Sequence, residues 1–305
     1  MKHIEFNLGF VCNNNCKFCT SHSENKNGKF ITQENAMKII EEYKKKGYDS
    51  IGFVGGEPTI HPKIITLIRN AREAGFKHIA ITTNGRRFSD KKFLLNAIKA
   101  GLNRVSFSIH SHLPKTEDDL TSVKGGFKQK LSALENILYL SKAGFINEKN
   151  VTIISVLNKE NYGTIIDSLG FFEGLGFSNF RVNFVRPTPF AIKNRIVPTY
   201  SEIKNTLFQI IKFTKKKDVF LKFDGIPPCV FGEHFEERYV PKQEQDIDEC
   251  ILNENDGTRR ISFVKQKKDK LNVKLNKCNC CKHSGSCFGV YKHYIILYGN
   301  EEFEK

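Results

Sequence analysis

The stretch Val11-Cys-Asn-Asn-Asn-Cys-Lys-Phe-Cys19 closely follows a predicted first strand at residues 3–8. It contains three cysteines at the spacing Cys-x3-Cys-x2-Cys: Cys12, Cys16 and Cys19. Three thiolates can hold three irons of a cubane iron–sulfur cluster and leave the fourth iron open for a substrate or cofactor. A partial zinc site is the alternative, because Cys-x2-Cys is also half of a structural zinc motif. The nearest histidine is His22 and the next cysteine is Cys229, so the spacing favours the cluster.

Around this stretch, short β-branched runs alternate with longer amphipathic segments up to about residue 215. Such βα units predict a parallel sheet covered by helices. The six predicted strands are residues 3–8, 50–55, 78–83, 104–110, 151–157 and 179–185. The six predicted helices are residues 32–46, 61–74, 90–100, 127–143, 162–174 and 201–215. Glycines just past four of the helices support these boundaries: Gly47, Gly75, Gly101 and Gly144.

The predicted fold class is α/β, a partial (β/α)6 TIM barrel, because right-handed crossovers curve consecutive parallel strands into a barrel or part of one. The polar motifs then fall at the carboxyl ends of the strands: residues 11–19, 55–58, 83–85 and 108–112. A doubly wound open sheet is the alternative, since periodicity does not distinguish closure from openness. We divide the chain into a core barrel at residues 1–215 and a small β-rich, cysteine-containing extension at residues 216–305.

Composition limits the class of protein. The chain has 305 residues, 39% of them hydrophobic, and no apolar run approaches the roughly 20 residues of a membrane span. No segment has the pattern of a signal peptide, so we expect a cytoplasmic protein. With nine cysteines in such a chain, metal or redox chemistry is a better explanation than disulfides.

The formal net charge of +15 raises the possibility of nucleic-acid binding. Lysine far outnumbers arginine, which indicates a compositional bias more than a phosphate-binding surface, so nucleic acid is not the favoured partner. An acidic segment at residues 233–256 precedes a basic one at residues 259–282. We interpret the two segments as solvated faces, with a docking surface for a partner as the alternative.

Two motifs together resemble the radical S-adenosylmethionine (SAM) superfamily. They are the three-cysteine motif with Phe18 before its last cysteine, and Gly-Gly-Glu-Pro at residues 55–58 after the second strand. The resemblance covers residues 3–215 and implies a [4Fe-4S] cluster that binds SAM through its methionyl amine and carboxylate. It also implies that an electron from a reductant such as flavodoxin or ferredoxin cleaves SAM to a 5′-deoxyadenosyl radical, which abstracts a substrate hydrogen.

The resemblance implies a set of SAM contacts: Phe18, Gly55, Gly56, Glu57, Ser108, Asn158 and Arg186. The two glycines allow close approach of the ligand, and Glu57 offers a carboxylate to the amine. Arg186 suits the SAM carboxylate, with a salt bridge to a loop acid as the alternative. Each remaining residue has a structural alternative, namely a core position for Phe18 and a turn for Ser108 and Asn158. No residue is assigned a catalytic role.

A second cysteine group follows the barrel: Cys229, Cys278, Cys281 and Cys287. Its spacing resembles the C-terminal extensions called twitch or SPASM domains, and four thiolates would suffice for one auxiliary [4Fe-4S] cluster. Cys250 and Cys280 are spare, and either could replace Cys229. A structural zinc site, in which His283 could substitute for a thiolate, is the alternative.

The predicted function is that of a radical SAM enzyme acting on a peptide or protein side chain, as many enzymes with such extensions do. The first alternative is rearrangement or modification of a nucleotide or RNA base. A non-catalytic electron carrier or cluster-binding protein is the least favoured hypothesis. The superfamily supports many reactions on nearly the same barrel, so the fold alone does not choose among substrates.

Overall fold

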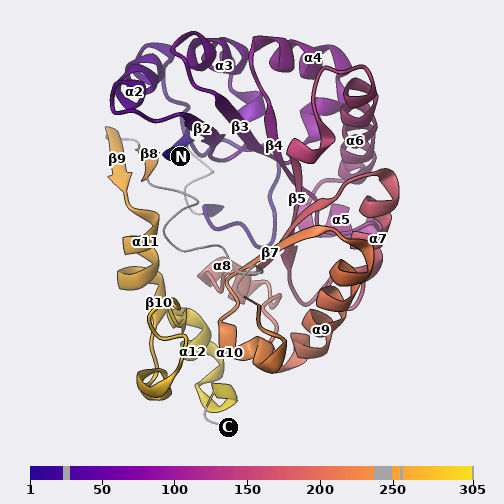
Figure 1. The fold of residues 1–305 in the computed structure, drawn as a ribbon, viewed down its shortest axis with the longest axis vertical. Coiled ribbons are helices and arrows are strands. Elements are labelled where there is room, and N and C mark those ends of the chain that lie inside the picture. Colours follow the sequence, from indigo (N-terminus) through magenta and orange to yellow (C-terminus); the bar gives the residue numbers. More distant parts are fainter. Residues whose placement is uncertain (23–27, 237–248, 255–256, 304–305) are drawn as a thin grey trace.

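The computed structural model describes residues 1–22, 28–236, 249–254 and 257–303. Its main element is a nine-stranded sheet in the order β7-β6-β5-β4-β3-β2-β1-β8-β9. The first seven strands follow the chain order and pair in parallel, as in a series of right-handed βα units (Figure 1). Their bounds are β1 His3–Asn7, β2 Ser50–Val54, β3 His78–Thr83, β4 Arg104–Ser108, β5 Val151–Leu157, β6 Asn179–Phe184 and β7 Phe220–Asp224.

Helices cover the outer side of this sheet (Figure 1). Those predicted from sequence are α2 Gln33–Lys45, α3 Ile64–Glu73, α4 Lys91–Ala100, α6 Gly126–Lys142, α7 Ile165–Leu175 and α9 Tyr200–Lys217. Two shorter helices, α5 Pro114–Thr121 and α8 Pro189–Lys193, lie in loops. Side-chain caps fix several starts: Asp90 accepts a hydrogen bond from Phe93 N (3.1 Å), and Thr199 and Glu202 form a reciprocal capping box.

The strands bury only one of their two faces completely. In β5, Val151, Ile153 and Leu157 are buried beneath the helices, whereas the alternating Thr152 and Ile154 are only partly buried. Because side chains alternate across a strand, the apolar core lies between the sheet and the helices, and the concave inner face stays accessible. The expected partial α/β barrel is confirmed.

The series of parallel strands that follow the chain order has seven members, β1 to β7, rather than the six expected. Strand β7 begins after residue 215 and pairs with β6, so residues assigned to the extension complete the sheet. At the opposite edge β8 (Glu249–Glu254) pairs in parallel with β1 and antiparallel with β9 (Gly257–Ile261). The division of the chain into two domains at residue 215 therefore stays a prediction.

The rest of the extension contains short elements: α10 Pro228–Phe231, α11 Phe263–Gln266, the antiparallel pair β10 Asn272–Val273 and β11 Val290–Tyr291, and α12 Lys292–Tyr298. Aromatic packing fixes this tail to the barrel, since Tyr294 is fully buried with its ring centroid 4.5 Å from that of Tyr200. The Tyr200 amide also donates to the Tyr294 hydroxyl at 2.9 Å.

Most of the acidic segment lies outside the described residues. Within the described part of the chain, no helix is both long and apolar enough to cross a membrane. The cytoplasmic location stays a prediction.

Candidate functional site

The first candidate site is a cavity of about 350 Å³ at the carboxyl ends of the strands. Thiols of the N-terminal loop line one side of it: Cys12, Cys16 and Cys19. Phe18 of the same loop and Lys130 of α6 also line it, and the remaining sides come from the ends of β2 to β7 and from the C-terminal tail: Gly55, Gly56, Asn84, Ser108, His110, Asn183, Arg186, Asp224 and Tyr291 among them. Residues from distant parts of the chain thus surround the three cysteines, as expected for parallel strands that end together.

Two glycines explain how the cysteine loop reaches this position. A Cβ added to Gly56 would lie 2.2 Å from Val11 O, and one added to Gly55 would lie 2.3 Å from Gly9 O. The Gly56 amide instead donates to Gly9 O at 2.8 Å. Both glycines line the cavity. Glycine is needed at these positions because the backbone of the cysteine loop lies against them, whether or not a ligand is bound.

Glu57 has a different environment from the one expected. It is 1% exposed and is not among the residues that line the cavity. Its carboxylate accepts hydrogen bonds from the amide and hydroxyl of Thr59, from the hydroxyl of Thr83 and from the amide of Asn84. Glu57 therefore joins the loops after β2 and β3, and its contact with the SAM amine stays a prediction.

The cysteine loop is also fixed from outside the sheet. The Asn15 amide donates to Thr121 O at 3.1 Å, and Arg86 donates from Nη1 to Asn13 O at 2.7 Å and to Asn14 Oδ1 at 2.9 Å. Contacts with α5 and with the loop after β3 thus hold the backbone between the first two cysteines. A loop held on several sides can present its thiols with little loss of conformational entropy on metal binding.

Burial favours the protonated form of the Cys12 and Cys16 thiols in the first loop. Burial raises the pKa of Cys12 to about 11 and that of Cys16 to about 12, with contributions from neighbouring cysteines and acids. The Asn14 amide donates toward Cys12 Sγ at 3.4 Å and opposes part of this shift. Because metal ligands are thiolates, binding iron here would release protons from these buried groups.

A buried ion pair supports the wall of the cavity near Cys16. The Lys130 ammonium donates to Glu117 Oε1 at 2.5 Å and to Ser108 O at 2.9 Å, and both side chains are almost completely buried. Glu117 Oε2 accepts from the amides of His110 and Ser111. Lys130 thereby places one positive charge in the cavity wall while Glu117 fixes the loop after β4.

His110 enters the cavity as a neutral imidazole. Burial lowers its pKa to about 4, and the Val156 amide donates to its Nδ1 at 3.1 Å. The proton of the neutral ring is therefore on Nε2. Phe18 packs edge-on against this ring, with 4.6 Å between ring centroids, and also lines the cavity.

The remaining predicted SAM contacts differ in whether they line the cavity. Ser108 and Arg186 line the cavity. Asn158 does not, because it is fully buried, with its Nδ2 donating to Val156 O and its Oδ1 accepting from the Glu160 amide. Asn158 has the hydrogen bonds of a turn-forming asparagine, the structural alternative for this position.

Arg186 hydrogen-bonds the Tyr291 hydroxyl, and its charge helps to hold the pKa of Asp224 low. Burial acts to raise that pKa, but Lys267, whose ammonium lies 2.6 Å from Asp224 Oδ1, and the nearby arginines outweigh it. Arg186 Nε and Asn183 Oδ1 are buried without a hydrogen-bond partner within the described residues. The cavity thus offers one donor and one acceptor to a ligand, and SAM carries both carboxylate and hydroxyl groups, so its residues fit that molecule.

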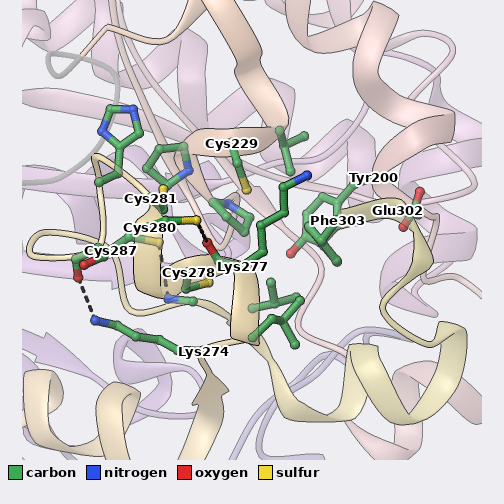
Figure 2. A pocket seen from close by; sticks show the side chains of 18 of the residues that line it. Tyr200, Cys229, Lys274, Lys277, Cys278, Cys280, Cys281, Cys287, Glu302 and Phe303 are labelled. Carbon is green, nitrogen blue, oxygen red and sulfur yellow. Dashed lines mark hydrogen bonds between the residues drawn. The ribbon is translucent and has the colours of Figure 1, made fainter. Parts of the chain in front are cut away.

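A second cavity, of about 360 Å³, lies between the tail and the barrel. Five cysteines line it, and Figure 2 shows their side chains gathered on one side with Tyr200 and Phe303 opposite: Cys229, Cys278, Cys280, Cys281 and Cys287. His283 also lines it. Sequence reasoning predicted this group, and the structure brings Cys229 to it from a segment far away in the chain.

Electrostatic interactions distinguish the cysteines of the second cavity. Burial raises the pKa of Cys229 to about 11, and the neighbouring cysteines that add to the shift are Cys287, Cys281 and Cys278. Cys280 instead donates to Lys277 O at 3.3 Å. The four-thiol set chosen from spacing is therefore mutually close. The side chain of Cys250 lies outside the described residues.

No described group of three or more His, Cys, Asp and Glu side chains is arranged around a single metal ion, at either cavity. The choice between a cluster and zinc at the second cavity therefore stays open.

Comparison with known proteins identifies the family. Residues 6–172, more than half of the 305, match the family described as the Radical SAM superfamily. The chain belongs to the radical SAM superfamily. It is accordingly an enzyme, and SAM and a [4Fe-4S] cluster are its cofactors. The resemblance stated from the cysteine and Gly-Gly-Glu-Pro motifs is confirmed, while the twitch or SPASM assignment of the tail stays a prediction.

Curated relatives include a probable GTP 3',8-cyclase of Saccharolobus islandicus strain M.14.25, 22% identical over 240 residues that cover 79% of this chain and 71% of that protein. A probable GTP 3',8-cyclase of Sulfurisphaera tokodaii is 27% identical over 192 residues, 59% of each protein.

Solved structures also resemble this radical SAM chain over nearly its whole length. Streptococcus suis SuiB bound to S-adenosylmethionine has a TM-score of 0.66 at 17% identity, covering 97% of this chain and 74% of SuiB. Native anSMEcpe with bound AdoMet has a TM-score of 0.64 at 14% identity, covering 96% of this chain and 90% of that one. At such identities the likeness shows the fold.

Sequence reasoning did not assign Lys130, Asp224 or Tyr291 to the site. Lys130 had a recognisable signal, because a lysine interrupts the buried face of α6 between Phe127 and Leu134. His110 lies in the strand-end segment 108–112 that the sequence predicted, but nothing in the sequence was a reason to assign it to the site. Tyr291 had no local signal, since only tertiary packing brings β11 to the barrel.

Proposed function

We propose that this radical SAM enzyme modifies a side chain of a peptide or protein. The observation that carries the proposal is the pairing of the barrel cavity with a second cysteine-lined cavity in a tail that packs onto it. Two proteins that share the fold over 95% or more of this chain have been solved with peptides: SuiB with precursor peptide SuiA, and anSMEcpe with the Kp18Cys peptide. Fold alone does not fix a substrate, so the proposal needs its own test.

In this proposal Cys12, Cys16 and Cys19 hold the first cluster. When bound, that cluster and SAM supply the carbon-centred radical that removes a hydrogen atom from the substrate. The protein contributes the rest of the site: the loop contacts orient the thiols, Arg186 Nε and Asn183 Oδ1 are free to hydrogen-bond the ligand, and Phe18 provides an apolar surface. Lys130 keeps one cation against the cysteine side of the cavity.

The second cavity would hold one auxiliary [4Fe-4S] cluster through Cys229, Cys278, Cys281 and Cys287. Four thiols close to one another and partly shielded from water provide the ligand set of such a cluster. The Gly289 amide, which donates to Cys287 Sγ at 3.2 Å, adds the type of N–H···S hydrogen bond that tunes cluster potentials. A flavodoxin or ferredoxin in the cytoplasm is the proposed reductant.

A nucleotide substrate is the second candidate, because the curated relatives are probable GTP 3',8-cyclases. The cyclases match over 79% or less of this chain; two peptide-bound structures match over 95% or more, and a third, anSMEcpe with the Cp18Cys peptide, over 72%. The peptide stays the first candidate because a likeness over 95% of this chain takes in the cysteine-lined tail, although the sequence identity to the cyclases is higher.

Substrate-dependent cleavage of SAM tests the proposal. The reconstituted enzyme is reduced anaerobically and mixed with SAM plus either a peptide pool or a nucleotide pool that contains GTP. We expect the peptide pool to raise 5′-deoxyadenosine formation at least severalfold over the rate without substrate. The C12A variant controls for SAM breakdown unrelated to the cluster. Stimulation by nucleotides alone would replace the proposal with the second candidate.

A further inference from the structure

The barrel contains a third cavity, of about 430 Å³, at the opposite end from the reaction cavity. It is lined mainly by residues in the amino-terminal halves of strands β1 to β7 or just before them, with Thr82 nearer the carboxyl end of β3: His3, Glu5, Gly52, Ala80, Thr82, Arg104, Ser106, Lys149, Asn150, Thr152, Asn179, Arg181 and Phe220 among them. Thr82 lines both this cavity and the reaction cavity. The third cavity therefore lies directly beneath the site of chemistry, and none of the described residues that line it is a cysteine.

Small side chains create this cavity. The inward positions of three neighbouring strands carry Gly52, Ala80, Thr82 and Ser106. In a closed TIM barrel the corresponding positions hold layers of bulky branched residues that fill the interior. Here those layers are absent from the lining, and an unfilled apolar interior would cost stability, whereas a polar hollow can hold water or a ligand.

Positive charge is concentrated on one wall of the cavity. Arg104 begins β4, Lys149 lies just before β5, and Arg181 lies on β6, and these three strands are adjacent in the sheet. Neighbouring strands are about 4.8 Å apart, so three adjacent strands bring their cations within reach of one small ligand. Arg104 and Lys149 are exposed and form no salt bridge within the described residues.

Among the described residues, Glu5 is the one acid that lines the cavity, and it does not cancel this charge. Glu5 stands on β1 and interacts with Arg181. Burial raises the pKa of Glu5, and the arginine only partly opposes the shift. Two cations, Arg104 and Lys149, remain without a matching acid in the lining.

Neutral hydrogen-bond donors complete the cationic wall: Ser106, Asn150 and Thr152 lie between the charged residues on the same strands or just before them. Hydroxyl and amide donors beside guanidinium and ammonium groups suit a tetrahedral oxyanion, which presents several acceptor oxygens. A carboxylate would use fewer of these donors.

We propose that this amino-terminal cavity of the barrel is a second ligand site, which binds the phosphate group of a small molecule through Arg104, Lys149 and the donors between them. The site is separate from the radical chemistry and does not depend on the proposed substrate.

Binding of inorganic phosphate tests the proposal. Titration calorimetry is carried out anaerobically on the cluster-loaded enzyme, at constant ionic strength and with saturating SAM so that the reaction cavity is filled. We expect saturable binding to the wild type and about tenfold or greater weakening in the R104Q/K149Q variant. The matched control K45Q/K92Q removes the same charge from exposed helix positions and should bind phosphate like the wild type.

A second measurement uses only the wild type, so that a folding defect in the variant cannot decide the result. Acetylation of lysines by a mild reagent is followed by mass spectrometry, with phosphate or with acetate at equal ionic strength. Phosphate should slow the modification of Lys149 severalfold and leave Lys92 unchanged. Absence of saturable binding, equal weakening in the control variant, or equal protection by acetate would each overturn the proposal.

Discussion

The reaction cavity takes its three cysteines from one loop of the barrel, whereas the second cavity takes Cys229 from the end of the sheet and its other thiols from residues 278–287. The first set is held by backbone hydrogen bonds, two glycines and contacts with α5, all within residues 1–121. The second set meets because the tail packs against the barrel, as Tyr294 does against Tyr200. A site built within one loop depends on local geometry, and a site built between segments depends on docking.

The two cavities are nevertheless adjacent. Tyr291 lines the reaction cavity, while the preceding Gly289 and Val290 line the second. Gly225 makes room for this arrangement, because a Cβ there would lie 2.7 Å from the Tyr291 hydroxyl oxygen. Lys267, also from the tail, pairs with Asp224 in the wall of the reaction cavity. The tail thus shapes the first cavity as well as forming the second.

The largest expected effect comes from removing any one thiol of the first set. Ala at Cys12, Cys16 or Cys19 should abolish SAM cleavage, because the remaining two thiolates cannot hold the cluster. Iron and labile sulfide should fall from about eight to about four atoms each per chain if both cavities hold cubane clusters. Retained cleavage in any single variant would contradict the proposed ligand set.

Replacing Cys281 by Ala should remove the metal of the second cavity and leave the cluster of the first cavity in place. About four irons should be lost while SAM cleavage without substrate continues, since the first loop is held independently of the tail. Formation of product should fall sharply. The C280A variant is the matched control, and it should keep its full iron content because Cys280 is directed to Lys277 O. Loss of one zinc instead of iron in C281A would make the tail site structural.

Gly56→Ala tests whether close contact positions the first loop. The new Cβ would meet backbone atoms of the loop at 2.2 to 2.6 Å, so the loop must move. We expect a loss of about 2 kcal/mol or more in stability and lower iron occupancy of the first site only. Gly163→Ala, which has open space around its Cβ, should leave the melting temperature and the iron content unchanged. Full iron loading in Gly56→Ala would show that the contact is dispensable.

The smallest expected effect is a pH dependence of the free energy of unfolding that comes from His110 in the reaction cavity. Burial lowers the pKa of His110 to about 4 from 6.5, so the unfolded chain binds a proton before the folded chain does. Neutral His110 therefore contributes to the free energy of unfolding above pH 6.5, and this contribution is lost as the pH falls toward 4. Between pH 7.5 and 5.5 we expect the free energy of unfolding to fall by about 1.3 kcal/mol.

Thermal unfolding at those two pH values checks this, with His110→Asn as the comparison because its side-chain oxygen can still accept from the Val156 amide. The variant should lose this share of the pH dependence. An unchanged pH dependence in the variant would place the acid sensitivity elsewhere. Buried carboxylates such as Glu117 and Asp224, whose pKa values are lowered, titrate below this window and do not obscure it.

Local sequence signals predicted the barrel well and its continuation poorly. Alternating β-branched runs and glycine-terminated helices gave all six predicted βα units, because periodicity and capping act over a few residues. Strand β7 was missed, since Phe220–Asp224 is short and follows the lysine-rich end of α9. The pairing of β8 with β1 is equally absent from local sequence signals, because it joins Ile4 to Glu249, far apart along the chain.

The sequence by itself determined the chemistry available to this protein: three thiols on one strand-end loop, six more after residue 228, and the family that such motifs define. Only the tertiary structure decided which polar side chains share those cavities. Glu57 and Asn158 satisfy their hydrogen bonds within loops, while Lys130, Asp224 and Tyr291 reach the reaction cavity. The physical reason is that ligand spacing is encoded along the chain, whereas hydrogen-bond satisfaction and burial depend on neighbours that folding brings together.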